Sequence, residues 1–294
     1  MSKQQEETLE FFSRAAERWK KLALSEAGVR VNVIRQRNDY VLEALGERPH
    51  LRSLLDIGCG TGDLAAAAAQ RGLRAVGVDF SEKMIEHAQV LGCKGCEFLC
   101  RSIFDCSFVP GEFDAAAANG FIEYISREEL HILLELLRRW LQPGGLLVLG
   151  SRNRLFNLLS LNEYTLLEAA CGALGVLAEE SAALCRATIA SEFLAQVGNL
   201  AVPPEQDFNH PATGIAVARR NQYTPAELGG ILARHGFSAF GLGPVHIHAM
   251  PPALKVSHPQ LHVALSELLQ IESGRSVALV PQASSFMIAA ERES

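Results

Sequence analysis

Gly58, Gly60 and Gly62 alternate directly after a run of apolar residues that predicts a buried strand, and an alanine-rich helix is predicted directly after them. Glycine readily adopts positive φ angles and lets the backbone approach a ligand closely, so this turn is suited to cradling a cofactor. Asp79 ends the next predicted strand, where a carboxylate can accept both hydroxyls of a ribose. Together the loop and Asp79 indicate a nucleoside cofactor.

The spacing within this loop distinguishes between nucleoside cofactors. Loops that bind dinucleotides carry a small residue where this chain has Asp63. Asp56 and Asp63 would both repel a pyrophosphate. A loop flanked by acids is better suited to S-adenosylmethionine (SAM), which carries a sulfonium and an amino group. A nicotinamide-dependent oxidoreductase is the disfavoured alternative.

Four segments then resemble, in the same order, the motifs of class I SAM-dependent methyltransferases. They are 55–62, 76–88, 113–119 and 141–148. The two N-terminal segments are specific together, whereas each of the others would be weak alone. The resemblance covers about 50–152 and resumes at 223–241 and 284–292.

The resemblance implies a set of residues around the cofactor. They are Arg37, Asp56, Gly58, Cys59, Gly60, Gly62, Asp79, Phe80, Met84, Ser102, Ile103, Asn119 and Gly120. Ser102 stands where the family often has an acid beside the adenine amino group, and Asp105 could replace that acid only if the loop shifted. Arg37 resembles the arginine that ubiquinone-biosynthesis O-methyltransferases place ahead of the glycine loop. The alternative is that Arg37 lies on a solvated helix face, and Arg30 and Arg35 are equally available for the same role.

The candidate catalytic residues are Tyr124 and His210. The Glu-His pair that the family commonly has after its fourth strand is Glu123-Tyr124 here, so one familiar base is missing. His210 precedes a proline in an expected loop and is a candidate base, although a solvated or structural histidine is the simpler interpretation.

The sequence assigns no metal site. Cys93 and Cys96 have the spacing of zinc ligands, but no second such pair follows them. Reduced thiols are the expected state of all seven cysteines. His246 and His248 would share one face of an extended strand, yet no third ligand is evident from the sequence.

The order of predicted strands and helices favours an α/β fold. We expect a Rossmann-like, seven-stranded, mostly parallel sheet with helices on both faces. Residues 1–48 would form an N-terminal helical cap, 49–152 and 223–294 the SAM-binding core, and 153–222 a helical lid over the substrate. An insertion at that point would lie at the carboxyl ends of the strands, where ligands bind in open α/β sheets.

Composition limits the possible partners. The 294 residues are 48% hydrophobic and carry a net charge of −6, and the absence of a basic tract argues against a nucleic-acid-binding surface. The polar first ten residues do not read as a secretory signal, and the longest apolar run is too short to span a bilayer. We therefore expect a cytoplasmic enzyme with a small-molecule substrate, and a homodimer is one possible assembly.

The predicted function is methyl transfer from SAM to a small molecule. O-methylation is favoured by its frequency in the family and by a loose similarity to the ubiquinone and magnesium-protoporphyrin methyltransferases. The residues do not distinguish an oxygen acceptor from nitrogen or carbon. A non-catalytic subunit that binds SAM is the alternative outside this enzyme class.

Overall fold

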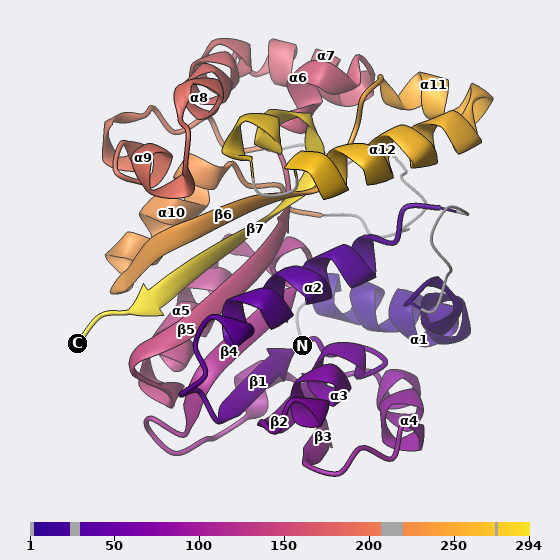
Figure 1. The fold of residues 1–294 in the computed structure, drawn as a ribbon, viewed down its shortest axis with the longest axis vertical. Helices are drawn as coiled ribbons and strands as arrows, with labels where there is room; N and C mark the ends of the chain where they lie inside the picture. Colours follow the sequence, from indigo (N-terminus) through magenta and orange to yellow (C-terminus); the bar gives the residue numbers. More distant parts are fainter. Residues whose placement is uncertain (1–2, 24–29, 207–219, 274–275) are drawn as a thin grey trace.

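The computed structural model describes residues 3–23, 30–206, 220–273 and 276–294. Its centre is a seven-stranded sheet with the strand order β3-β2-β1-β4-β5-β7-β6 (Figure 1). The strands are β1 (Ser53–Ile57), β2 (Arg74–Asp79), β3 (Cys96–Cys100), β4 (Phe113–Asn119), β5 (Leu141–Arg152), β6 (Phe237–Ile247) and β7 (Ala283–Arg292). Strand β7 runs antiparallel to β5 and β6 on either side of it, and all other pairs of neighbouring strands in this sheet are parallel. The predicted fold class is confirmed.

Helices cover both faces of the sheet (Figure 1). The helices of the described residues are α1 (Lys3–Ala23), α2 (Val33–Gly46), α3 (Asp63–Gln70), α4 (Glu82–Val90), α5 (Arg127–Trp140), α6 (Phe156–Ser160), α7 (Glu163–Ala170), α8 (Leu174–Arg186), α9 (Ala190–Leu194), α10 (Pro225–Arg234), α11 (Pro252–Ser257) and α12 (Pro259–Ser273). Short 3-10 helices are η1 (Ile103–Asp105), η2 (Ile122–Tyr124), η3 (Val197–Asn199) and η4 (Val277–Gln282). No helix in the described part of the chain is both long and apolar enough to cross a membrane.

The two faces of the sheet bury two separate apolar cores. Leu55 belongs to the core that includes side chains of α5, α8 and α10, whereas its neighbour Leu54 belongs to the core formed with α2 and α3. Successive side chains of a strand point to opposite faces, so a strand covered on both sides must be apolar throughout. This explains why β1 is buried at all five positions.

Several boundaries differ from the sequence-based expectations. Residues 143–145 predict a turn before a strand at 146–151, but they lie at a register shift inside one longer strand, β5, because Phe113 pairs with Leu141 before Ala115 pairs with Leu146. Residues 237–241 are expected to start a strand, with an excursion from the sheet beginning at 244, whereas β6 continues to Ile247 because it pairs with β7 along almost its whole length. Residues 224–227 predict the start of a helix, and α10 begins there with a capping box.

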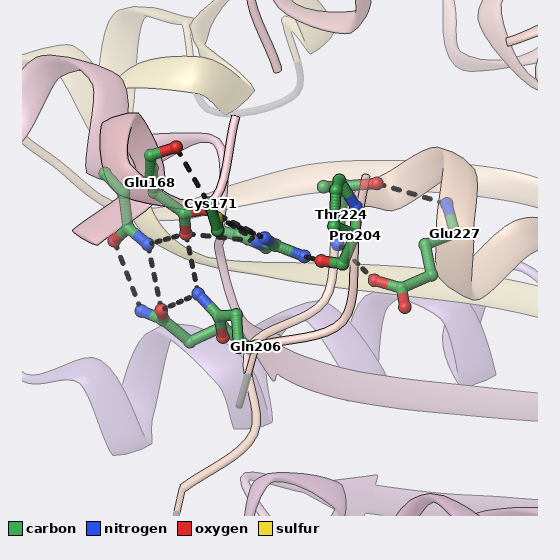
Figure 2. Close-up of polar contacts among 9 residues, drawn as sticks. Glu168, Cys171, Pro204, Gln206, Thr224 and Glu227 are labelled. Carbon is green, nitrogen blue, oxygen red and sulfur yellow. Dashed lines mark hydrogen bonds and ion pairs between the residues drawn. The ribbon is translucent and has the colours of Figure 1, made fainter. Parts of the chain in front are cut away.

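The insertion after β5 has its own buried polar core. Arg154 and Glu168 are both completely buried, and Arg154 Nη2 lies 2.8 Å from Glu168 Oε2. The amides of Asn157 and Gln206 also donate to Glu168 Oε1, and Arg154 Nη1 donates to the carbonyl of Pro204 (Figure 2). These bonds join the start of the insertion to the segment leading out of it.

The described helices of the insertion pack away from the glycine loop. Helix α8 contacts η4, and α9 contacts β6, so they cover the β6 end of the sheet (Figure 1). Residues 207–219 lie outside the described residues. The assignment of 153–222 as a substrate lid therefore stays a prediction.

Candidate functional site

The glycine loop connects β1 to α3 through left-handed backbone. Gly58, Gly60 and Gly62 have φ angles of 65°, 52° and 79°. A Cβ at Gly62 would lie 2.8 Å from the Phe98 ring, whereas a Cβ at Gly60 would meet nothing within 4 Å. Gly62 is thus required for packing of the loop against the sheet, and Gly60 borders open space that a ligand could use.

Asp79 at the end of β2 is fixed by the loop itself. The backbone amide of Gly60 donates to Asp79 Oδ2 at 3.0 Å, and the amide of Ser81 donates to Asp79 Oδ1 at 2.9 Å. Burial raises the pKa of Asp79 to about 6, and the two amide donors oppose that rise. The carboxylate keeps lone pairs that could accept two hydroxyls.

Asp56 at the end of β1 is a second buried carboxyl group. It is 2% exposed, and its Oδ2 atom has no hydrogen-bond partner among the described residues. Burial raises the pKa of Asp56 to about 7, and the nearby Asp79 and Asp63 also raise it. A buried acceptor without a partner is unfavourable, so this carboxyl group is suited to a cationic ligand.

Two adjoining cavities lie over the carboxyl ends of β1, β2 and β4. The first is lined by Asp79, Phe80 and Met84 on one side and by Ser102 and Ile103 on another. The second has polar walls that include Arg37, Asp56, Cys59, Asp63 and Arg220. Six residues line both cavities and mark their junction: Trp19, Gly58, Gly60, Asn119, Gly120 and Tyr124.

Arginines surround a buried glutamate at the edge of the second cavity. Glu123 is 1% exposed, with Oε2 at 2.5 Å from Arg220 Nε and Oε1 at 3.5 Å from Arg37 Nη1. Burial would raise the pKa of Glu123, but Arg220, Arg37 and Arg152 outweigh it and lower the pKa. Burial and the proximity of Arg220 in turn lower the pKa of Arg152. Three cations around one carboxylate leave an excess of positive charge here.

Helix α1 completes the wall of the first cavity. Its side chains Gln5, Thr8, Phe12 and Trp19 line that cavity. The Phe12 ring packs edge-on against the Tyr124 ring, with centroids 5.2 Å apart. Sequence analysis predicts a helical cap but none of these individual residues, because apolar side chains at helical spacing do not reveal which surface they cover.

Nearly all of the predicted cofactor residues line a cavity. Twelve of the thirteen do so: Arg37, Asp56, Gly58, Cys59, Gly60, Asp79, Phe80, Met84, Ser102, Ile103, Asn119 and Gly120. Gly62 instead packs inside the loop, and Asp105 is absent from both cavity walls.

The two predicted catalytic residues differ in what the structure shows. Tyr124 lines both cavities, but burial, followed by the charge of Glu123, raises its pKa, so its hydroxyl stays protonated at neutral pH. His210 lies outside the described residues. The wall residues that sequence analysis missed include Glu123 and Arg220, which are close only after folding.

The match to a known family covers the glycine loop and four strands. Residues 54–145 match the family model described as a methyltransferase domain. The chain contains a class I SAM-dependent methyltransferase domain. The chain is 28% identical over 107 residues to the ubiquinone biosynthesis O-methyltransferase of Chromobacterium violaceum, covering 35% of this chain and 45% of that protein. Human methyltransferase-like protein 27 is 35% identical over 127 residues, covering 41% of this chain and 49% of that protein. The matched segments thus span about half the length of these curated relatives.

Solved structures resemble the methyltransferase domain together with its additions. Magnesium protoporphyrin IX methyltransferase from Synechocystis, with bound SAM, has a TM-score of 0.57 at 17% identity and covers 100% of this chain and 99% of that one. A chain from the complex of the Haloferax volcanii Trm112 methyltransferase activator and a putative methyltransferase has a TM-score of 0.57 at 15% identity, with coverages of 96% and 98%. At these identities the likeness shows the fold.

Proposed function

We propose that this chain binds SAM and transfers its methyl group to a small-molecule acceptor. The observation that carries the proposal is the pair of buried carboxyl groups, Asp56 and Asp79, on either side of a left-handed glycine loop that borders two joined cavities. Their spacing along two adjacent parallel strands suits a ligand with a ribose at one end and a cationic amino acid at the other.

The residues present fit the cofactor on chemical grounds. Asp79 would accept the ribose hydroxyls in charge-assisted hydrogen bonds, and Phe80, Met84 and Ile103 would contact the adenine. The unpartnered Oδ2 of Asp56 would accept from the ammonium group. Arg37, which lines the same cavity, would pair with the carboxylate. When bound, SAM supplies a methyl group already activated by its sulfonium.

The acceptor would enter at the junction of the two cavities. Trp19 and Tyr124 line both, and Phe12 extends the aromatic wall of the first. Aromatic walls suit an acceptor with a flat or apolar body. These side chains would exclude water and align the acceptor, which is the main task of the protein when the donor is already activated.

We favour oxygen as the acceptor atom. The excess of positive charge around Glu123, from Arg37, Arg152 and Arg220, would stabilise an ionised oxygen of the acceptor and reduce the need for a base. The similarity to a ubiquinone biosynthesis O-methyltransferase points in the same direction. His210 as base, a cytoplasmic location and a homodimer stay predictions, and N- or C-methylation is an outcome of the test below.

Calorimetric titration with SAM and with its demethylated product tests the cofactor part of the proposal. We expect Asp79→Asn to weaken SAM binding more than tenfold, because the amide loses the charge-assisted bonds to the ribose. Asp105→Asn serves as the matched control, since Asp105 is exposed and outside both cavities. Equal dissociation constants for the two variants would refute the ribose role of Asp79.

Incubation of the protein with labelled SAM and a metabolite extract tests the transfer. We expect label in a small molecule, and the labelled atom identifies O-, N- or C-methylation. Tight SAM binding without turnover on any extract would favour the rival interpretation, a subunit that binds SAM without catalysis. No binding of SAM or its product at millimolar concentration would exclude both.

A further inference from the structure

Three buried histidines meet outside the cavities described above. His246 lies near the end of β6, His248 directly follows β6, and His262 comes from α12, which packs beside β6 (Figure 1). They are 8%, 7% and 2% exposed. One ring nitrogen from each lies within 4.8 Å of those of the other two. Helix α12 thus supplies the third histidine that sequence analysis could not pair with the first two.

The distances are close to those of a metal site. His246 Nε2 lies 3.0 Å from His262 Nε2. Two imidazole nitrogens on a tetrahedral zinc ion, each about 2.0–2.1 Å from the metal, would be separated by about 3.3 Å. The remaining nitrogen of His246, Nδ1, lies 3.1 Å from Ser284 Oγ. A hydrogen bond to the second ring nitrogen is the usual way in which a ligating imidazole is oriented.

The cluster contains polar atoms that lack partners. Neither ring nitrogen of His248 has a hydrogen-bond partner among the described residues, and His262 Nδ1 has none either. Buried polar groups in folded proteins are nearly always paired, so a buried imidazole with two unpaired nitrogens requires an explanation. A cation held between the three rings would provide the missing partner for His248.

The backbone at this point is also unusual. His246 has a φ angle of 58°, which is rare for a residue other than glycine. The pairing of β6 with β7 passes from Val245 directly to Ile247, so His246 leaves the regular ladder. As a result, the rings of His246 and His248 lie 4.2 Å apart between centroids. Strained conformations of this kind persist where the surrounding structure requires them, commonly at binding sites.

Charge limits which ion can bind. Among the described residues, the cluster offers three imidazole nitrogens and no carboxylate ligand, and the neutral imidazole is the form that binds metals. Three neutral imidazoles suit zinc and related transition metals rather than Mg²⁺ or Ca²⁺, which prefer oxygen ligands. The positive charge of the nearby Lys255 would weaken cation binding.

We propose that His246, His248 and His262 bind a zinc ion that joins α12 to the end of β6. With three protein ligands, the ion would keep a fourth position for water. The site is separate from the cavities assigned to SAM and acceptor, because none of the three histidines lines either cavity. It does not depend on the methyltransferase proposal.

Zinc titration of the full chain, stripped with a chelator, tests the site. We expect one zinc ion per chain with micromolar or tighter affinity, and a higher melting temperature when zinc is bound. His262→Ala should weaken binding at least a hundredfold. His258→Ala is the matched control, since His258 lies one helical turn earlier at an exposed position and should retain full affinity.

Three further variants keep the result interpretable. His248→Gln removes a ring that makes no hydrogen bond to any described residue, so it should fold normally yet lose zinc. Lys255→Gln should tighten binding because it removes an opposing charge. Cys93→Ser/Cys96→Ser should leave the affinity unchanged; if it abolishes binding while His248→Gln does not, zinc binds the thiols instead. No stoichiometric binding, or equal affinity in His262→Ala and His258→Ala, would overturn the proposal.

Discussion

Replacing Asp56 with asparagine should stabilise the ligand-free protein at alkaline pH and at the same time weaken SAM binding. The side chain is almost completely buried, and one of its oxygens has no partner among the described residues. Ionisation of this group is therefore costly until a cation is bound. Asparagine has nearly the same shape and never ionises, so it removes the cost together with the attraction for the ammonium group of SAM.

The magnitude follows from the pKa of Asp56. Folding raises this pKa from 3.8 to about 7, chiefly by burial. Because the folded pKa is raised, the favourable contribution of the protonated group is complete below the unfolded pKa and is lost as the pH rises through about 7. Linkage then gives a loss of about 2.5 kcal/mol in the free energy of unfolding between pH 5 and pH 8.

Urea unfolding of the ligand-free protein at pH 5 and pH 8 measures this difference. The wild type should lose stability between these values, and Asp56→Asn should lose about 2.5 kcal/mol less. Part of the dependence should remain, because Asp79 also has a raised pKa. Asp105→Asn, at an exposed position, should show the same pH dependence of stability as the wild type. An identical pH dependence in wild type and Asp56→Asn would refute the reasoning.

Two further substitutions test the packing around the site. Gly62→Ala should destabilise the protein by about 2–4 kcal/mol in urea unfolding. Residue 62 has a φ angle of 79°, and the added Cβ would lie 2.8 Å from the Phe98 ring. A change near zero in the free energy of unfolding would show that the ring moves freely. Glu168→Ala should cost about 3–5 kcal/mol because it leaves Arg154 buried without its carboxylate. Glu163→Ala on the same helix is the control, and equal costs for the two would exclude a special role for the buried pair.

The succession of strands along the chain was predictable because the local sequence patterns agree with the fold. Each parallel strand is an apolar run followed by a glycine or polar turn, and the motif segment 113–119 coincides with β4. The ends of β5 and β6 were not predictable. Pro143 and the glycines after it normally indicate a turn, but pairing with neighbouring strands extends β5 through them. Such pairing is a property of the whole sheet, and no local pattern encodes it.

Residues of the site were predictable only where a motif fixes them. Asp79 and the glycine loop lie within one continuous segment of the chain, so their spacing is visible in the sequence. Glu123 and Arg220 form an ion pair across 97 positions, and His262 reaches His246 from another helix. Such contacts depend on how the elements pack together, for example α12 against the strand β6, and a single sequence shows the residues without showing their partners.

Helix α1 has a consequence for how the molecule assembles. It precedes every strand of the sheet in the chain, yet Phe12 packs on Tyr124 and Gln5 donates to Glu129, which lies 124 positions later. On the ribosome, the helix must therefore wait until β4 and η2 have emerged before it finds its binding surface. Contacts this distant in sequence form slowly. Closure of the first cavity by α1 therefore depends on η2 and α5, and the pocket cannot be complete before both have emerged.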